Sequence, residues 1–232
     1  MMRKVLVVLA VLGFALALLP LAYEAGVAGK PGDLASAYLD RSPKDFAAAN
    51  VVTAIVVSYR GFDTLGEVAV LFAATAGVGA LLTRKRMGPS ATGGKRTEST
   101  EILRTAAGLL TGLLVMFGAY IFLHGHLTPG GGFQGGVVIA TAVLLNLLAA
   151  PRSHLAHGAV TVVESLSGAV YVALGLLGIY LARGFLDPRA LPIGKIGALA
   201  SAGTIPLIYS VIGLKVGAEL SAILDALKGD RE

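Results

Sequence analysis

Long apolar runs follow one another along this chain, separated by short stretches rich in Gly, Pro and charged residues. A helix that crosses the hydrocarbon core of a membrane needs roughly 20 mostly apolar residues. Stretches close to this length lie at residues 5–22, 65–82, 102–123, 133–149, 159–181 and 197–214. We expect the last stretch to continue as a helix to about Lys228. The pattern therefore predicts an all-α integral membrane protein with six transmembrane helices.

A further apolar stretch, residues 46–58 (Phe46 to Ser58), is too short to span a membrane upright. Charged residues flank it: Lys44 and Asp45 come before it and Arg60 follows. We expect a short helix that lies at the outer interface or re-enters the membrane. A seventh span here would place the basic cluster at residues 84–86 outside, which the usual distribution of positive charge opposes.

Basic residues indicate the orientation of the spans. Lys and Arg concentrate on the cytoplasmic side of membrane proteins, and with an inside N-terminus the inner segments hold more of them than the outer ones. We therefore expect a multi-pass protein of the cell (cytoplasmic) membrane with both termini cytoplasmic. The first stretch, which follows Arg3 and Lys4, also resembles a cleaved signal peptide. We interpret it as an anchor, because no clean small-x-small cleavage site precedes a globular domain.

A polar segment divides the spans into two groups. Residues 87–100, MGPSATGGKRTEST, are rich in Gly, Ser and Thr and are typical of a linker. The sequence thus predicts a two-span unit at residues 1–86, a cytoplasmic linker at 87–100 and a four-span unit at 101–232.

Composition agrees with a membrane protein and narrows its chemistry. Hydrophobic residues make up 55% of the 232 residues, against about 45–50% in soluble domains, and the mean hydropathy is +0.78. The chain has no Cys, which excludes thiolate metal sites, Cys-held iron–sulfur clusters and Cys nucleophiles. No nucleophile–base set and no metal-ligand set are visible, so we expect no catalytic residues and no enzymatic activity of the chain on its own.

Ionisable residues near the apolar spans are the first candidate site. Glu164 lies in the first turns of the fifth span, where it serves either as a proton or ion relay or as a hydrogen-bonded structural acid. Lys215 and Glu219 follow the predicted sixth span at i,i+4 spacing, so they share a helix face and can pair. Of the two interpretations of this pair we favour a solvated face at the inner interface. Asp225 lies further along the same helix.

The segment RGFDTLGE, residues 60–67, is the second candidate. Gly61 permits a break before the second span, Asp63 is well placed as its N-cap and Glu67 falls one turn inside. The two carboxylates then share a face, where they form a mouth for a cation or exchange protons. The alternative is a capping arrangement paired with Arg60.

The segment HGHLTPGGGFQGG, residues 124–136, joins the third and fourth spans. Gly130, Gly131 and Gly132 after a proline predict a loop, because each Gly costs about 1 kcal/mol relative to Ala in a helix. Such a loop allows close helix approach and offers backbone amides and carbonyls to an ion or a neighbour. It is not a phosphate-binding loop, because no Gly-Lys-Ser/Thr follows.

Two histidines open this loop. His124 and His126 do not complete a metal site, since no acidic partner is near in sequence. Proton handling suits imidazole better, and the alternative is that both side chains only hydrogen-bond the loop. His154 and His157 lie in a predicted cytoplasmic turn, where we expect them to be solvated.

These motifs resemble a known family. GHLTPGGGFQGGVVIA at residues 125–140 is similar to the signature of the B subunit of Mrp (Mnh) multisubunit sodium/proton antiporters, and the whole of residues 101–228, ending in IGLKVGAEL at 212–220, resembles that protein. Residues 48–83, above all RGFDTLGE, resemble the E subunit of archaeal membrane-bound hydrogenases and the C-terminal part of the large Mrp A subunit.

The resemblance implies an accessory, non-redox membrane subunit of a Mrp-type antiporter module, in a respiratory complex that couples hydrogenase or sulfur-reductase electron flow to ion translocation. The alternative is a structural scaffold that conducts no ions. The resemblance also implies Na+ and H+ as transported ions, with Fe–S and metal centres only on partner subunits. It implies contacts with other membrane subunits and lipid but not with nucleic acid. Its site residues are Glu67 with Asp63, then Pro129 and Phe133, with His124 and His126 as weaker candidates. The buried Lys/Glu pairs of the large antiporter subunits are not expected here.

Overall fold

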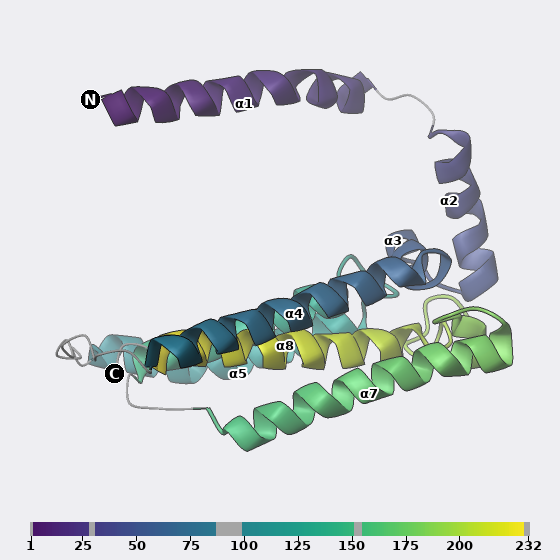
Figure 1. Ribbon diagram of the computed structural model, residues 1–232. Coiled ribbons are helices and arrows are strands. Elements are labelled where there is room, and N and C mark those ends of the chain that lie inside the picture. The colour runs from purple at the N-terminus through teal and green to yellow at the C-terminus, as the bar shows by residue number, and fades with distance from the viewer. Residues whose placement is uncertain (1, 28–30, 87–98, 151–154, 230–232) are drawn as a thin grey trace. The chain divides into compact units, whose positions relative to one another are not determined.

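The computed structural model describes residues 2–27, 31–86, 99–150 and 155–229, which form helices and loops with no strand among them (Figure 1). The elements in chain order are α1 (Met2–Val27), α2 (Asp33–Phe46), α3 (Val51–Ala54), the π-helical turn η1 (Ile55–Tyr59), α4 (Gly61–Arg86), α5 (Glu101–Leu123), α6 (Gly132–Ala149), α7 (His157–Ala182), the 3-10 turn η2 (Pro188–Ala190) and α8 (Ile205–Gly229). Most of the predicted linker, residues 87–98, lies outside the described residues. Its last residue, Thr100, is the N-cap of α5.

The chain divides into two compact units, residues 1–40 and 41–232. The first unit contains α1 and most of α2, and α1 exposes its large apolar side chains between Val5 and Tyr23. All contacts discussed below lie within the second unit, which contains the end of α2 and every later element.

Six helices of the described chain are long and apolar enough to cross a membrane, which confirms the predicted fold class. They are α1, α4, α5, α6, α7 and α8. Among them α8 is the most enclosed: 56% of its apolar window is buried, against 22% for α7 and 0% for α4. It packs against α4, α5, α6 and α7, and Figure 1 shows it lying alongside α4 and α7. The central helix of this unit is therefore α8.

The sixth span starts later than the sequence predicts. We expected it at residues 197–214, whereas the spanning helix is Ile205–Lys228. Residues 191–204 form a loop in which Gly197, Ala202 and Gly203 have positive φ angles of 88°, 64° and 58°. A right-handed helix does not tolerate such backbone angles. The predicted boundary was wrong because this loop is itself apolar.

The short apolar stretch 46–58 is not one helix. The helix α2 ends at Phe46, Ala47 takes a positive φ of 50°, and a new helix starts after Asn50. The Asn50 side chain accepts a hydrogen bond from the Thr53 N–H (3.3 Å), as an N-cap does. The short helix expected here is present as α3 and η1, but it begins at Val51 and not at Phe46. Its position relative to the membrane stays a prediction.

Glycines set the distance between α5, α6 and α8. A Cβ added at Gly118 of α5 would lie 2.7 Å from the carbonyl oxygen of Gly135 on α6. One added at Gly136 would lie 2.7 Å from the carbonyl oxygen of Gly213 on α8. Real Cβ atoms do not approach so closely, so these helices pack backbone to backbone, as small residues allow in membranes.

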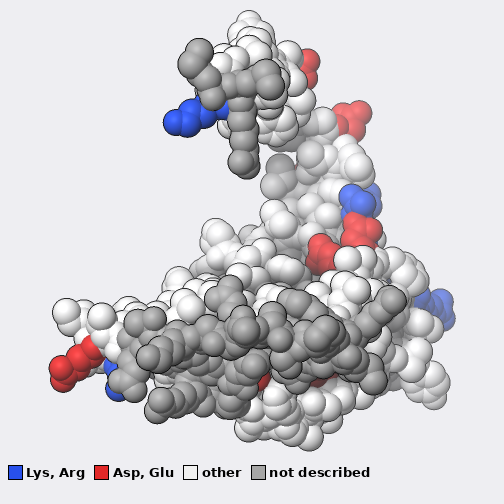
Figure 2. Space-filling model, turned by 60° about the vertical axis from the view of Figure 1, so that its left-hand side comes forward, with Lys and Arg blue, Asp and Glu red and all other residues white. Residues whose placement is uncertain are grey.

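The outward faces of the spans are apolar. Large hydrophobic side chains such as Phe62, Leu109 and Leu176 are 71%, 70% and 58% exposed. On the face in Figure 2, charged side chains form small separate groups among uncharged atoms. Such surfaces suit lipid or the apolar faces of neighbouring membrane helices.

Candidate functional site

Lys215 and Glu219 form a buried ion pair in the middle of α8. The Lys215 Nζ atom donates to Glu219 Oε1 at 2.7 Å, and the two side chains are only 8% and 0% exposed. The pairing predicted from i,i+4 spacing is confirmed, but the solvated face that we favoured is wrong. The later start of α8 explains the difference, because it moves both residues from the membrane edge into the span. The expected absence of a buried Lys/Glu pair is wrong for the same reason.

Neighbouring helices complete the surroundings of this pair. The Lys215 ammonium lies 5.5 Å from the centre of the Phe72 ring of α4, a cation–π contact. On α7, a Cβ added at Gly168 would lie 3.7 Å from Lys215 Nζ, so this glycine leaves room for the ammonium. Glu164, also on α7 and half-buried, lies close enough for its charge to act on Glu219. The helices α7 and α8 thus bring two carboxylates and one ammonium together, and α4 adds an aromatic ring.

His157, the first residue of α7, contacts Asp225 near the end of α8. The distance from His157 Nε2 to Asp225 Oδ2 is 3.3 Å, and the aspartate side chain is 3% exposed. His157 was expected only to be solvated; it is 75% exposed but has this buried partner. His154 lies outside the described residues.

The candidates at the start of α4 are arranged differently from the prediction. The helix already begins at Gly61, so Asp63 lies in its first turn and is not the N-cap. The Asp63 carboxylate pairs with Arg60 at 2.7 Å, which is the alternative arrangement that the sequence left open. Glu67 is exposed, and its charge reaches the hydroxyls of Tyr171 and Tyr209.

The loop after α5 is held by the segment that contains α3. The Asn50 side-chain amide donates to the carbonyl oxygens of Gly125 (2.8 Å) and Thr128 (3.0 Å). The Thr53 hydroxyl donates to the Gly125 carbonyl at 2.6 Å and accepts from the Tyr209 hydroxyl of α8 at 3.1 Å. These four bonds tie the two motifs that carry the family resemblance to each other and to α8.

The two loop histidines point to different partners. His126 is fully buried, with Nε2 3.4 Å from the Ala198 carbonyl oxygen and no hydrogen-bond partner for Nδ1 among the described residues. Burial lowers the pKa of His126, against the opposing effect of the Ala198 carbonyl. His124 bonds the Tyr120 carbonyl of α5 at 3.1 Å and stacks on the Tyr120 ring. His126 therefore stays neutral near pH 7, since its surroundings favour the uncharged ring.

The glycines of the loop lie directly against α8. Gly130 has a φ of 151°, and a Cβ added at Gly132 would lie 2.6 Å from the Tyr209 carbonyl oxygen. Gly131 faces the Tyr209 ring, where an added Cβ would lie 3.2 Å from Cζ. Larger residues would separate the loop from α8.

Pro129 and Phe133 lie on the outer side of the loop. Pro129 is exposed and helps to line a shallow pocket with Phe117 and Gln134, and Phe133 is 39% exposed. Both residues are therefore accessible to lipid or to a neighbouring membrane protein.

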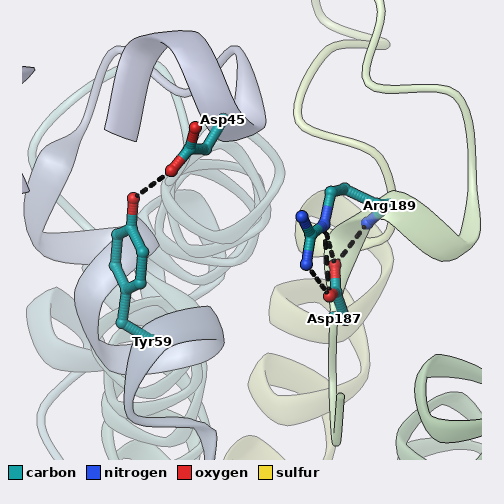
Figure 3. A network of polar contacts seen from close by, with 4 residues as sticks. All are labelled: Asp45, Tyr59, Asp187 and Arg189. Atoms are coloured by element: carbon teal, nitrogen blue, oxygen red, sulfur yellow. Dashed lines mark hydrogen bonds and ion pairs between the residues drawn. The ribbon is translucent and has the colours of Figure 1, made fainter. Parts of the chain in front are cut away.

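Two polar pairs, one from Asp45 and Tyr59 and one from Asp187 and Arg189, lie near each other (Figure 3). The Tyr59 hydroxyl donates to Asp45 Oδ2 at 2.8 Å, and Arg189 Nε donates to Asp187 Oδ1 at 2.9 Å. Arg189 also lies over the Phe46 ring, 6.0 Å from its centre. Burial and the Asp45 carboxylate raise the pKa of Tyr59, and the Asp187 carboxylate raises the pKa of Arg189, so the tyrosine stays neutral and the arginine stays charged near pH 7.

Metal ligation is not evident in this part of the molecule. Within the described residues, no group of three or more His, Asp or Glu side chains is arranged to hold a metal ion. The chemistry that the buried groups support is the transfer or binding of protons and small cations.

Sequence reasoning missed several members of these networks. Asn50 and Thr53 gave no signal beyond an N-cap pattern, because their partners lie more than 70 residues away. For Tyr209 the sequence did offer a signal, because a hydroxyl inside an apolar span needs a hydrogen-bond partner. The contact between His157 and Asp225 depends on the true start of α8 and was not predictable from the wrong boundary.

Comparison with known proteins relates the chain to two families. The family model described as a domain related to the MnhB subunit of the Na+/H+ antiporter matches residues 102–222. The model for the E subunit of MBH matches residues 1–98. The division at residues 86 and 101 stays a prediction, although these two matches lie on either side of it.

Relatives extend over most of the chain. An uncharacterized protein of Methanocaldococcus jannaschii is 31% identical over 197 residues, covering 74% of both chains. The A/B subunit of a probable K+/H+ antiporter of Rhizobium meliloti is 32% identical over 154 residues, which cover 55% of this chain and 15% of that protein.

Two solved structures are similar to this chain and agree with the family matches. A chain of the membrane-bound sulfane sulfur reductase (MBS), an archaeal respiratory membrane complex, matches 98% of both chains with 42% identity and a TM-score of 0.78. A chain of the Mrp complex from Dietzia sp. DQ12-45-1b has 27% identity and a TM-score of 0.70 over 95% of this chain and 26% of that one. The protein is thus a multi-pass membrane protein that belongs to the family related to the MnhB subunit of Na+/H+ antiporters, joined to a region like the E subunit of membrane-bound hydrogenase.

Proposed function

We propose that this chain is an accessory, non-redox membrane subunit of a Mrp-type Na+/H+ antiporter module, within a respiratory complex that couples electron flow in a hydrogenase or sulfur reductase to ion translocation. The similarity to chains of the MBS and Mrp complexes along nearly the full length supports this assignment. In this proposal the chain lies in the cytoplasmic membrane with both termini inside, and neighbouring membrane subunits and lipid cover its apolar faces. Na+ and H+ are the transported ions, and Fe–S and metal centres belong to partner subunits.

The observation that carries an active part in ion transfer is the buried pair of Lys215 and Glu219. A charge at the centre of a membrane span costs about 2.5–3.5 kcal/mol, and charged residues in spans usually mark ion pathways. Gly- and Ala-rich helices that served only for packing would need no such pair. A cation or proton that reaches Glu219 competes with Lys215 for the carboxylate, so the pair responds to ion movement nearby.

A scaffold role has its own supporting observation. The bonds from Asn50 and Thr53 to the loop after α5, with Tyr209 of α8, join the two predicted units through buried and part-buried contacts. A chain with this function would hold antiporter-like subunits against each other and conduct no ions itself.

Replacement of the Glu219 carboxylate by an amide distinguishes the ion-transfer role from the scaffold role. Everted membrane vesicles that contain the complete complex with Glu219→Gln should show strongly reduced Na+-dependent proton movement per assembled complex, with the amount of assembled complex measured on blue-native gels. Glu101→Gln, an exposed acid in the first turn of α5, is the matched control and should transport normally. Normal transport with Glu219→Gln would favour the scaffold.

A further inference from the structure

Asp225 is a buried acid whose surroundings leave it half satisfied. Its side chain is 3% exposed, Oδ2 lies 3.3 Å from His157 Nε2, and Oδ1 has no hydrogen-bond partner within the described residues. A buried carboxylate oxygen without a donor is unfavourable. The arrangement suits a group that accepts and passes on a proton better than a purely structural contact.

His157 connects this acid to the exterior of the chain. Its side chain is 75% exposed, although it contacts a side chain that is almost fully buried. Imidazole gains and loses a proton near neutral pH, and either ring nitrogen can donate. One residue therefore links the surface of the chain to the interior of the helix bundle.

From this end, polar groups continue between α7 and α8. His157, Glu164 and Gly168 are spaced i, i+7 and i+11, which places them on one face of α7. Their neighbours on α8 are Asp225, Glu219 and Lys215 respectively, in the order of two antiparallel helices. We call this set of six residues the α7–α8 seam.

Glu219 is the next acceptor along the seam. Its Oε1 accepts from Lys215, whereas Oε2 is buried and has no hydrogen-bond partner in the described chain. Asp225 and Glu219 are six residues apart, a rise of about 9 Å along an α-helix. Each of these two residues thus has one buried carboxylate oxygen without a donor, the type of polar group that holds water inside a protein.

The charged groups near these two acids can be named for the described residues. Glu164 faces Glu219 from α7, and Lys215 pairs with it on α8. Lys228, near the end of α8, donates to the Ala150 carbonyl at 3.1 Å. The helix α6 has no charged residue, and α5 has only Glu101 and Arg104 in its first turn. On α4, the Phe72 ring contacts the Lys215 ammonium.

We propose that His157 and Asp225 form the proton entrance of the α7–α8 seam. A proton from solvent binds the imidazole, and the Nε2 proton passes to Asp225 Oδ2, which leaves a neutral ring and a neutral acid. Asp225 then gives its proton through water to the free oxygen of Glu219 and returns to the carboxylate. Neutralised Glu219 releases its hold on the Lys215 ammonium. This inference rests on the proposed function, because it assumes that the pair of α8 takes part in transport.

The test measures proton movement in vesicles that contain the complete complex. His157→Ala and Asp225→Asn should lower the rate about ten-fold or more, the range in which a positioned proton-transfer group contributes. Added imidazole should restore transport to His157→Ala, because the site opens to solvent, but not to Asp225→Asn. Asp225→Glu should retain most of the rate, and His157→Gln, which keeps a donor for Asp225, should remain slow.

A structural role predicts another pattern. His157→Gln would then transport normally, and imidazole would not rescue His157→Ala, which overturns the proposal. If both variants transport normally while Glu219→Gln does not, the entrance is wrong and the proposed function stands. If Glu219→Gln also transports normally, the entrance is wrong and the scaffold role is favoured. Should Asp225→Asn fail to assemble, the imidazole experiment on His157→Ala still decides.

Discussion

The Lys215 Nζ and Glu219 Oε1 atoms lie 2.7 Å apart in the middle of α8. Packing of α8 against α4, α6 and α7 buries both side chains. Two opposite charges thus occupy the centre of the most enclosed span of the chain. Breaking such a pair leaves one buried charge without a partner, whereas replacing both charges with apolar groups does not. This difference gives the first prediction.

Single substitutions of the pair should destabilise the complex more than the double substitution. Lys215→Met or Glu219→Met should each lower the free energy of unfolding by about 3–5 kcal/mol, since one buried charge stays unpaired. The double variant Lys215→Met/Glu219→Met should be close to wild type. Thermal stability of the detergent-purified complex measures this. A double variant less stable than either single one would contradict the account.

Glu67→Gln should lower Na+-dependent transport without affecting assembly. This residue is exposed on α4, its charge reaches Tyr171 and Tyr209, and the resemblance to Mrp A marks it as an ion-path acid. Asp63→Asn is the comparison: its carboxylate already pairs with Arg60, so its loss should have a smaller effect. Vesicle transport and blue-native gels distinguish the two outcomes. Unchanged transport in Glu67→Gln would remove this residue from the path.

Asn50→Ala should weaken the attachment of the loop after α5. It removes two hydrogen bonds to backbone carbonyls, each worth about 1 kcal/mol, and the cap of α3. We expect a lower melting temperature of the complex with an unchanged transport rate per assembled complex. Gly125→Ala should act more severely, because its Cβ would lie 2.5 Å from Tyr209 Cδ2. A normal melting temperature in both variants would show that the loop is held in another way.

Acid should destabilise the protein through His126. Burial lowers the pKa of His126 in the folded state, so below the ordinary value of about 6.5 the unfolded chain binds the proton more readily. Stability from this group is therefore complete above that pH and falls as the pH drops below it. Melting temperatures at pH 7.5 and 5.5 should differ less for His126→Gln than for wild type. An equal loss in both would assign the acid sensitivity to other groups.

The spans were predictable from the sequence because lipid requires long apolar helices, and α5 and α6 begin and end close to the expected residues. The start of α8 was not predictable from the sequence, because hydropathy does not distinguish an apolar loop from an apolar helix. That single error placed Lys215 and Glu219 at the membrane edge. The contact of Asn50 with Gly125 joins residues far apart in sequence, and no local pattern reveals such a partner.

The most direct test is Na+/H+ exchange by proteoliposomes that contain the purified complex with Lys215→Met/Glu219→Met. This variant lacks both charges but leaves no unpaired one, so transport can be measured on an intact assembly. The account predicts that the complex assembles and that its exchange rate falls to a small fraction of wild type. Exchange at the wild-type rate would contradict an ion path through this chain.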